Sequence, residues 1–174
     1  MSNSYKSWQK LFLFCFGLFL ATAFCMKWME TDFIENGKIF TIIGLEITYS
    51  RQKIISILSS VDPLVKTILR YHLAFDFVFM LGAYGGIASL CIMAGKKIAG
   101  TAMAKVLMLL AILQLLAWAC DIYENLCLLK WISNPSAVDD LLVYHSLVAT
   151  KWIIALTGAL VAIPIVLRKS RKTF

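Results

Sequence analysis

Four long apolar runs dominate the chain, and their lengths match what a helix needs to cross a bilayer. A hydrocarbon core about 30 Å thick requires about 20 predominantly apolar residues per helix. The runs cover residues 11–28, 71–95, 103–132 and 141–167. The pattern predicts an all-α membrane protein in which residues 1–174 form a single domain, a bundle of four transmembrane helices.

A segment of mixed polarity at 29–70 separates the first two runs and is too long to be a simple turn. The Asn-Gly pair at 36–37 is a strong signal for a tight hairpin, and residues 39–43 and 45–49 are β-branched and aromatic. We expect a small β-sheet there, with Gly44 as a bend or bulge.

The remainder of this outer segment has a helical pattern. Ile54, Ile55 and Leu58 recur at helical intervals within 51–60, which is typical of a short amphipathic helix lying on the outer surface. The Asp-Pro pair at 62–63 then offers a helix cap and a proline for the first helical position. The four spans are therefore predicted to carry a small extracytoplasmic cap of β-hairpin and short helix.

The composition supports this assignment. Hydrophobic residues make up 60% of the chain and charged residues only 16%, and the mean hydropathy is +0.79. A soluble domain of 174 residues has no core large enough to hide so much apolar side chain.

The charge distribution predicts the orientation. Nine basic residues, with no acidic residue among them, fall on one side of a chain with four spans; they are Lys6, Lys10, Lys96, Lys97, Lys105, Arg168, Lys169, Arg171 and Lys172. The positive-inside rule therefore places both termini in the cytoplasm. The formal charge of +7 is a topology signal, so we expect membrane lipids and no nucleic acid as partners. The plasma membrane or a bacterial inner membrane is favoured over an organelle.

The first run has an alternative interpretation. Lys6 and Lys10 resemble the basic region of a signal peptide, and Ala21-Thr22-Ala23 resembles a small-residue cleavage site. The same residues suit a retained spanning helix, and we favour retention.

Polar residues interrupt three of the four runs at matching depths. On a helix, Gln114, Asp121, Glu124 and Asn125 share one stripe. His72 and Asp76 are four residues apart near the outer end of the second span, and Tyr144 and Lys151 are seven apart in the fourth. Because each ionised group facing lipid at mid-membrane costs about 2.5 to 3.5 kcal/mol, we expect these side chains to face one another.

Three interpretations of this constellation stay open. The residues are interfacial and hydrated, or they form a structural network that specifies helix packing, or they line a functional pocket. The leading functional prediction is that the pocket binds or carries a small amphiphile, lipid or cation. Asp76, Asp121 and Glu124 would then be charge partners, and Lys151 would be the internal counter-ion. His72 and Tyr144 would be hydrogen-bonding groups. Gln114 and Asn125 of the polar stripe complete the predicted site.

Two alternatives belong to other functional classes. One is a membrane enzyme acting on a lipid-like substrate, with His72 or Glu124 as general acid or base. The other is a non-catalytic subunit or pore-forming accessory protein whose buried charges set helix packing. No catalytic residue can be assigned from the sequence.

Other candidate features are weaker. Gly82 and Gly86 have the spacing that lets helices approach, within the chain or in a homo-oligomer. The five cysteines contain no Cys-x-x-Cys pair; a bond from Cys25 to Cys120 or Cys127 stays open, although buried small hydrophobes are the favoured role. Two histidines on different spans indicate no metal site, and no cofactor motif is present.

Two families with four spans invite comparison. Claudin-type proteins have a similar shape, but their Trp, Gly-Leu-Trp and paired-Cys signature is missing between Met29 and Arg70. The stretch His72-Leu73-Ala74-Phe75-Asp76 resembles the acid-bearing second span of the sigma-2 receptor and sterol isomerase group. The resemblance covers these five residues alone, so it assigns no family. It implies only an analogous mechanism, in which an acid-lined cavity binds an amphiphilic amine or a sterol.

Overall fold

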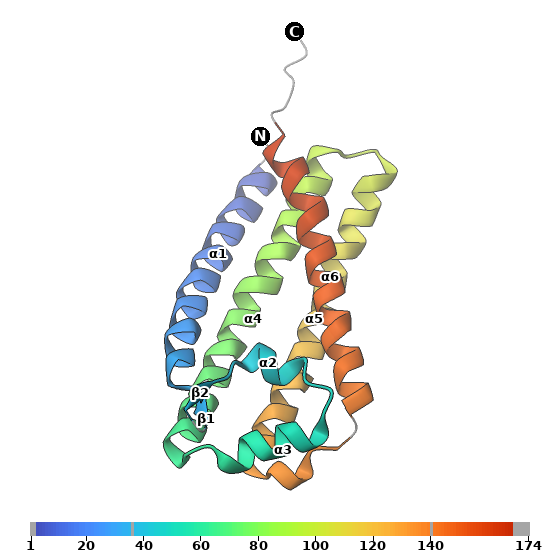
Figure 1. Ribbon diagram of the computed structural model, residues 1–174. Coiled ribbons are helices and arrows are strands. Elements are labelled where there is room, and N and C mark those ends of the chain that lie inside the picture. The colour runs from blue at the N-terminus through green and yellow to red at the C-terminus, as the bar shows by residue number, and fades with distance from the viewer. Residues whose placement is uncertain (1–2, 36, 140, 169–174) are drawn as a thin grey trace.

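The computed structural model describes residues 3–35, 37–139 and 141–168 and consists mainly of four long helices. They are α1 (Asn3–Met29), α4 (Pro63–Lys97), α5 (Ala102–Ser133) and α6 (Leu141–Leu167). All four are long and apolar enough to cross a membrane. In Figure 1 the start of α1, the α4–α5 turn and the end of α6 lie together at one end of the bundle, the terminal end. The segment between α1 and α4 covers the opposite end, the cap end.

Helices α4 and α5 each begin after a residue whose side chain caps the helix. The Asp62 side chain accepts a hydrogen bond from the Leu64 amide at 2.7 Å, and Pro63 is the first residue of α4. Thr101 accepts from the Ala104 amide at the start of α5. These side chains satisfy amide groups that the first helical turn leaves without partners. The Asp-Pro cap was therefore predicted correctly, and α4 starts there, eight residues before its apolar run.

The helix α4 is the centre of the bundle. It packs along α1 on one side and against α5 and α6 on the other, whereas within the described residues α1 has little contact with α5 or α6. Gly82 permits the close approach of α1, because a Cβ atom there would lie 2.7 Å from the Phe19 backbone nitrogen. This arrangement separates α1 from α6 across the face of α4, as Figure 1 shows.

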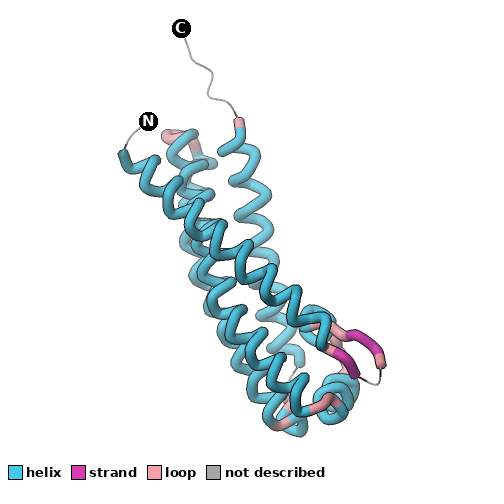
Figure 2. Tube along the Cα trace, turned by 90° about the vertical axis from the view of Figure 1, so that its left-hand side faces the viewer, coloured by secondary structure: helices cyan, strands magenta, loops and turns pink. Residues whose placement is uncertain are grey.

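The β-hairpin of the cap is shorter than predicted and lies earlier in the chain. Strands β1 (Ile34–Glu35) and β2 (Lys38–Ile39) pair antiparallel, with Ile34 opposite Ile39. Gly37 has φ of 75°, which suits a tight turn. Asn36, the other residue of the turn signal, lies outside the described residues. Figure 2 shows this hairpin at the edge of the cap, beside the end of α1.

The predicted strands at 39–43 and 45–49 are wrong: only Ile39 of this stretch belongs to a strand, and residues 42–46 form a helix. Helix α2 spans Ile42–Glu46, and the Thr41 hydroxyl accepts a hydrogen bond from the Gly44 amide at 2.9 Å as its cap. The helical turn buries Ile42, Leu45 and Glu46 together. Strand preference depends strongly on context, and here burial of one helical face against the bundle outweighs the β-branched composition.

The predicted amphipathic helix is confirmed as α3 (Arg51–Ser60). Its side chains Ile54 and Leu58 are fully buried in the core of the cap end. The Arg51 Nε atom donates a hydrogen bond of 2.6 Å to the carbonyl of Val138. Through this contact, α3 connects the cap to the segment that joins α5 and α6, which contains the short 3₁₀ helix η2 (Pro135–Ala137).

Candidate functional site

A buried lysine occupies the middle of the polar constellation. The Nζ atom of Lys151, on α6, lies 2.6 Å from Asp121 Oδ1 and 2.6 Å from Glu124 Oε2, both on α5. The contact with Asp121 is a well-directed hydrogen bond, whereas that with Glu124 is an ion pair of poorer geometry. All three residues are at most 6% exposed. One ammonium group thus bridges two carboxylates that are one helical turn apart.

Helix α4 completes the network. The Tyr84 hydroxyl donates a hydrogen bond to Asp121 Oδ2 at 2.7 Å. The Asn125 side-chain amide donates to Asp76 Oδ2 at 2.6 Å. The polar side chains of α4, α5 and α6 therefore meet at one level, because the stripe on α5 faces both neighbouring helices.

Glu46 enters the network from the cap and was not predicted. Its Oε2 atom lies 4.0 Å from Lys151 Nζ, and the residue is 7% exposed. Burial raises the pKa of Glu46 above the ordinary glutamate range; the negative charges of Asp121 and Glu30 add to the rise, and Lys151 opposes it. The signal in the sequence was a single acid among apolar residues such as Ile42 and Leu45. It indicates a buried acid only when the segment is recognised as a helix.

We call the five ionisable residues of this network the acid cluster: Glu46, Asp76, Asp121, Glu124 and Lys151. Four carboxyl groups thus surround one ammonium group. Tyr84, like Glu46, was missed by the sequence analysis. It stands between glycines that suggested helix packing, and its role depends on α4 and α5 lying side by side.

The other predicted site residues lie outside this network. Gln114 is buried one level nearer the terminal end, where its Nε2 atom donates to the carbonyls of Leu110 and Ile154. Tyr144 packs against Trp131 and is buried. His72 is buried with its ring 5.3 Å from that of Phe33. The chain therefore brings together five of the eight predicted residues, namely Asp76, Asp121, Glu124, Asn125 and Lys151.

A cavity of about 250 Å³ opens beside the acid cluster. It is bounded by α1, α2, α4, α5 and α6 and by Glu30 of the 3₁₀ helix η1 (Glu30–Asp32). Its polar lining consists of Glu30, Glu46, His72, Asp76, Tyr84, Asp121 and Lys151. Glu30 has its own partner, Lys27, at 2.6 Å. The cavity therefore gives access to Glu46 and Asp76, neither of which has a cation within 3.5 Å among the described residues.

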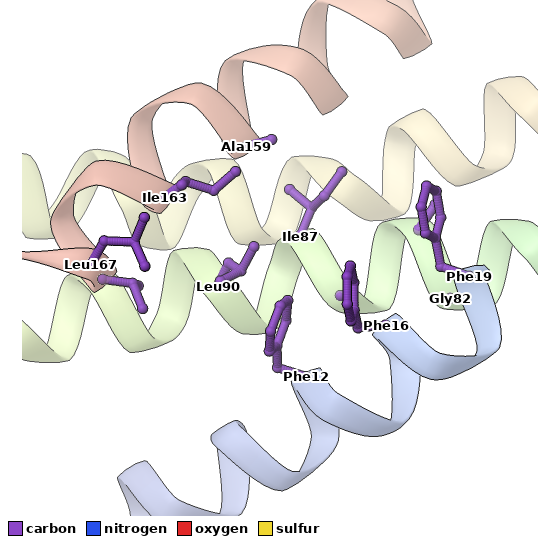
Figure 3. Close-up of a pocket in the computed structure, with 12 residues that line it drawn as sticks. Phe12, Phe16, Phe19, Gly82, Ile87, Leu90, Ala159, Ile163 and Leu167 are labelled. Atoms are coloured by element: carbon purple, nitrogen blue, oxygen red, sulfur yellow. The ribbon is translucent and has the colours of Figure 1, made fainter.

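A second cavity of about 390 Å³ adjoins the first and is almost entirely apolar. It lies in the gap between α1 and α6, with α4 as its floor, and we call it the apolar groove. Figure 3 shows Phe12 and Phe16 of α1 and Ile163 and Leu167 of α6 on either side of Ile87 and Leu90 of α4. The residues that line both cavities are Phe19, Ala83, Ile87 and Ala159. A charged end and an apolar end thus share a boundary.

The groove explains part of the glycine pattern. Gly82 and Gly86 line it, and Gly82 serves the contact of α1 with α4 inside one chain. A homo-oligomer through these glycines stays a prediction. All five cysteines are free, so no disulfide joins Cys25 to Cys120 or Cys127.

Among the described residues, no group of three or more His, Cys, Asp and Glu side chains is placed to hold a metal ion. Comparison of the chain with known protein families, with curated proteins and with solved structures finds no match. The function is therefore inferred from the acid cluster, the cavity and the groove.

Proposed function

We propose that this protein is a multi-pass membrane protein that binds a single-chain amphiphile with a positively charged head. The head lies in the cavity beside the acid cluster, and the chain lies in the apolar groove between α1 and α6. The observation that carries the proposal is the shared boundary of these two cavities: acidic side chains line part of the first, and the second is almost entirely apolar.

The charge of the cavity supports a cationic head. Lys151 offers one positive charge to Asp121 and Glu124, while Asp76 and Glu46 also reach the cavity. A buried charge is tolerated where a partner of opposite sign accompanies it. An ammonium head supplies such a partner, whereas a carboxylate or phosphate head adds repulsion.

The combined length of the cavity and the groove supports a long apolar chain. Lys151 and Leu167 are 16 residues apart on α6, which corresponds to about 24 Å along the helix axis at 1.5 Å per residue. One leaflet contributes about 15 Å of hydrocarbon, half of the bilayer core. A chain that starts at the acid cluster therefore finds apolar lining over more than one leaflet.

The four candidate spans also define the orientation that we propose. The basic residues Lys96 and Lys105 flank the terminal-end turn, so the positive-inside rule places the terminal end in the cytoplasm and the cap outside. In intact cells, an impermeant maleimide should label Lys38→Cys in the cap and leave Lys105→Cys at the turn unlabelled. The reverse pattern would contradict this orientation.

The binding proposal is tested with photoactivatable probes that share one chain and differ in their heads. Diazirine-tagged hexadecyltrimethylammonium, hexadecanol and palmitate are crosslinked to the protein in maltoside micelles, and the labelled residues are mapped by mass spectrometry. We expect the trimethylammonium probe to label the groove walls on α1 and α6 and to compete best. Equal labelling by all three heads, or labelling confined to the outer faces of the helices, would contradict the proposal.

Two variants of α6 separate groove binding from general partition into the micelle. Ile163 lines the groove, whereas Leu160 is 71% exposed on the outside of the same helix. Ile163→Trp should weaken capture at least about tenfold, a change of 1.4 kcal/mol. Leu160→Trp, the matched control, should leave capture unchanged.

A further inference from the structure

We propose that the acid cluster is also a proton site: without ligand it holds protons, and the positive charge of the bound head displaces one of them into water. This inference rests on the proposed function and specifies how the same site compensates charge. The protein would therefore exchange a cationic amphiphile for a proton.

The buried charges of the acid cluster do not balance. Four carboxyl groups surround the single ammonium of Lys151, and Glu46, Asp121, Glu124 and Lys151 are each at most 7% exposed. Charged groups removed from water without a partner are strongly disfavoured, and neighbouring carboxyl groups resolve the conflict by keeping protons. One ammonium compensates one carboxylate, so the cluster is neutral only when its other carboxyl groups are protonated.

The contacts distinguish the ionised carboxylate from the protonated ones. Asp121 has the best compensation, because it accepts hydrogen bonds from both Lys151 and Tyr84. Among the described residues, Asp76 accepts a side-chain hydrogen bond from the neutral amide of Asn125 and from no cation. The Glu46 Oε2 atom lies 4.0 Å from the Nζ atom of Lys151, which Asp121 and Glu124 share. Because the carboxyl groups interact, the protons belong to the cluster as a whole. Asp76 and Glu46 are the protonated members that line the cavity.

Titratable groups on all the surrounding elements bear on the cluster. Those that face the cluster are Glu46 on α2, Glu30 on η1, His72, Asp76 and Tyr84 on α4, Cys120, Asp121 and Glu124 on α5, and Tyr144 and Lys151 on α6. Glu30 is already paired with Lys27. His72 and Tyr144 are buried beside apolar and aromatic rings. The cluster therefore receives no second cation from the described residues around it.

The exchange balances charge and atoms. A cationic head enters the cavity, one O–H bond of Asp76 or Glu46 breaks, and its proton passes to water through the cavity that both residues line. The resulting carboxylate compensates the head. The net charge of the buried site is the same before and after binding, so neither state contains an unpaired buried charge.

The test uses a probe that has no proton of its own. Hexadecyltrimethylammonium is titrated calorimetrically into the protein in maltoside micelles, in two buffers with different protonation enthalpies at pH 7. The difference between the observed heats gives the number of protons released. We expect about one proton per bound cation, because the coupled cluster exchanges one charge for another. The double variant Asp76→Asn/Glu46→Gln should release far less, whereas the exposed Asp32→Asn should match the wild type.

Each outcome has a separate meaning. Binding with heats that do not depend on the buffer would overturn the exchange and leave the proposed binding function intact. Proton release of the same size in the double variant would also overturn the assignment to Asp76 and Glu46. Failure of the probe to bind would reject the proposed function itself and, with it, the exchange. Near-ultraviolet circular dichroism of the double variant verifies that it is folded before either titration is interpreted.

Discussion

The two ends of the bundle are built differently. Towards the cap end the interior combines a large apolar core with a buried ionic network centred on Lys151, Asp121 and Glu124. Towards the terminal end it contains small and apolar ones such as Cys91, Ala94 and Ala162. Loss of one charge leaves its partners buried without compensation, whereas loss or gain of a methyl group changes only volume. Substitutions of the same size should therefore have very different effects on stability at the two ends.

The largest expected effect is at Lys151. Lys151→Met leaves Asp121 and Glu124 without their cation and should cost about 3 to 5 kcal/mol of the free energy of unfolding, the range for a broken buried ion pair. Unfolding of the protein in detergent micelles, followed by circular dichroism, measures this. Lys130→Met is the matched control, because Lys130 pairs with Asp139 at 3.1 Å with both side chains more than half exposed. It should cost less than about 1 kcal/mol.

The structure changes what the single variants of Asp121 and Lys151 should show. If these two residues formed an isolated ion pair, each single variant would be less stable than the double variant. Because Glu124 lies equally close to Lys151, Asp121→Asn leaves the lysine with one carboxylate and should be milder than Lys151→Met. Equal losses from these two single variants would mean that Glu124 does not support the lysine.

The second effect tests close packing at the groove. An added Cβ atom at Gly82 would lie 2.7 Å from Phe19 N and 2.9 Å from Cys15 O, so α1 must shift on α4. Gly82→Ala should therefore cost about 1 to 3 kcal/mol of stability, as overpacked sites do. Gly17→Ala is the control, because nothing lies within 4 Å of its Cβ position, and alanine is the better helix former. The same unfolding measurement compares the two, and equal stabilities would show that α1 is free to move on α4.

The long helices were predictable, but the residues at which they begin and end were not all predicted equally well. Apolar runs identified all four, and the predicted ends of α5 and α6 agree with the structure to within one residue. Helix α1 begins at Asn3, eight residues before its apolar run, whereas the Asp-Pro pair at 62–63 correctly predicted that α4 begins ahead of its own apolar run. Hydropathy marks the part of a helix that suits lipid, whereas capping and backbone hydrogen bonds decide where it begins.

The site was predictable where it depends on depth along one helix. Asp121 and Lys151 were expected to meet because their depths along the predicted spans matched, and their side chains lie 2.6 Å apart. Glu46 was not expected, because its position depends on how the cap folds back onto the bundle. Its neighbours have a strand-like composition, yet they form a helix whose buried residues Ile42 and Leu45 join the core of the cap end. Local pattern therefore predicted the spans, and tertiary context determined the cap.

The smallest expected effect is confined to this cap and concerns its dependence on pH. Burial, followed by the negative charges of Asp121 and Glu30, raises the pKa of Glu46, and Lys151 only partly opposes the rise. The folded cap therefore binds a proton more tightly than the undocked segment does. Docking of α2 is fully stabilised below the range in which a free glutamate titrates, near pH 4.3, and it weakens as pH rises from there through the raised pKa.

Hydrogen exchange of the α2 amides, corrected for the intrinsic effect of pH on exchange, measures this local opening. Protection in the wild type should fall with rising pH while protection in the middle of α4 stays constant. Glu46→Gln, which cannot ionise, should keep α2 protected across the range, and Asp32→Asn, exposed on the neighbouring 3₁₀ helix, should behave as the wild type does. Protection that rises with pH would mean that Glu46 is docked as a carboxylate on Lys151. The cap would then be held by an ion pair, as the interior at this end is, and protonation would open it.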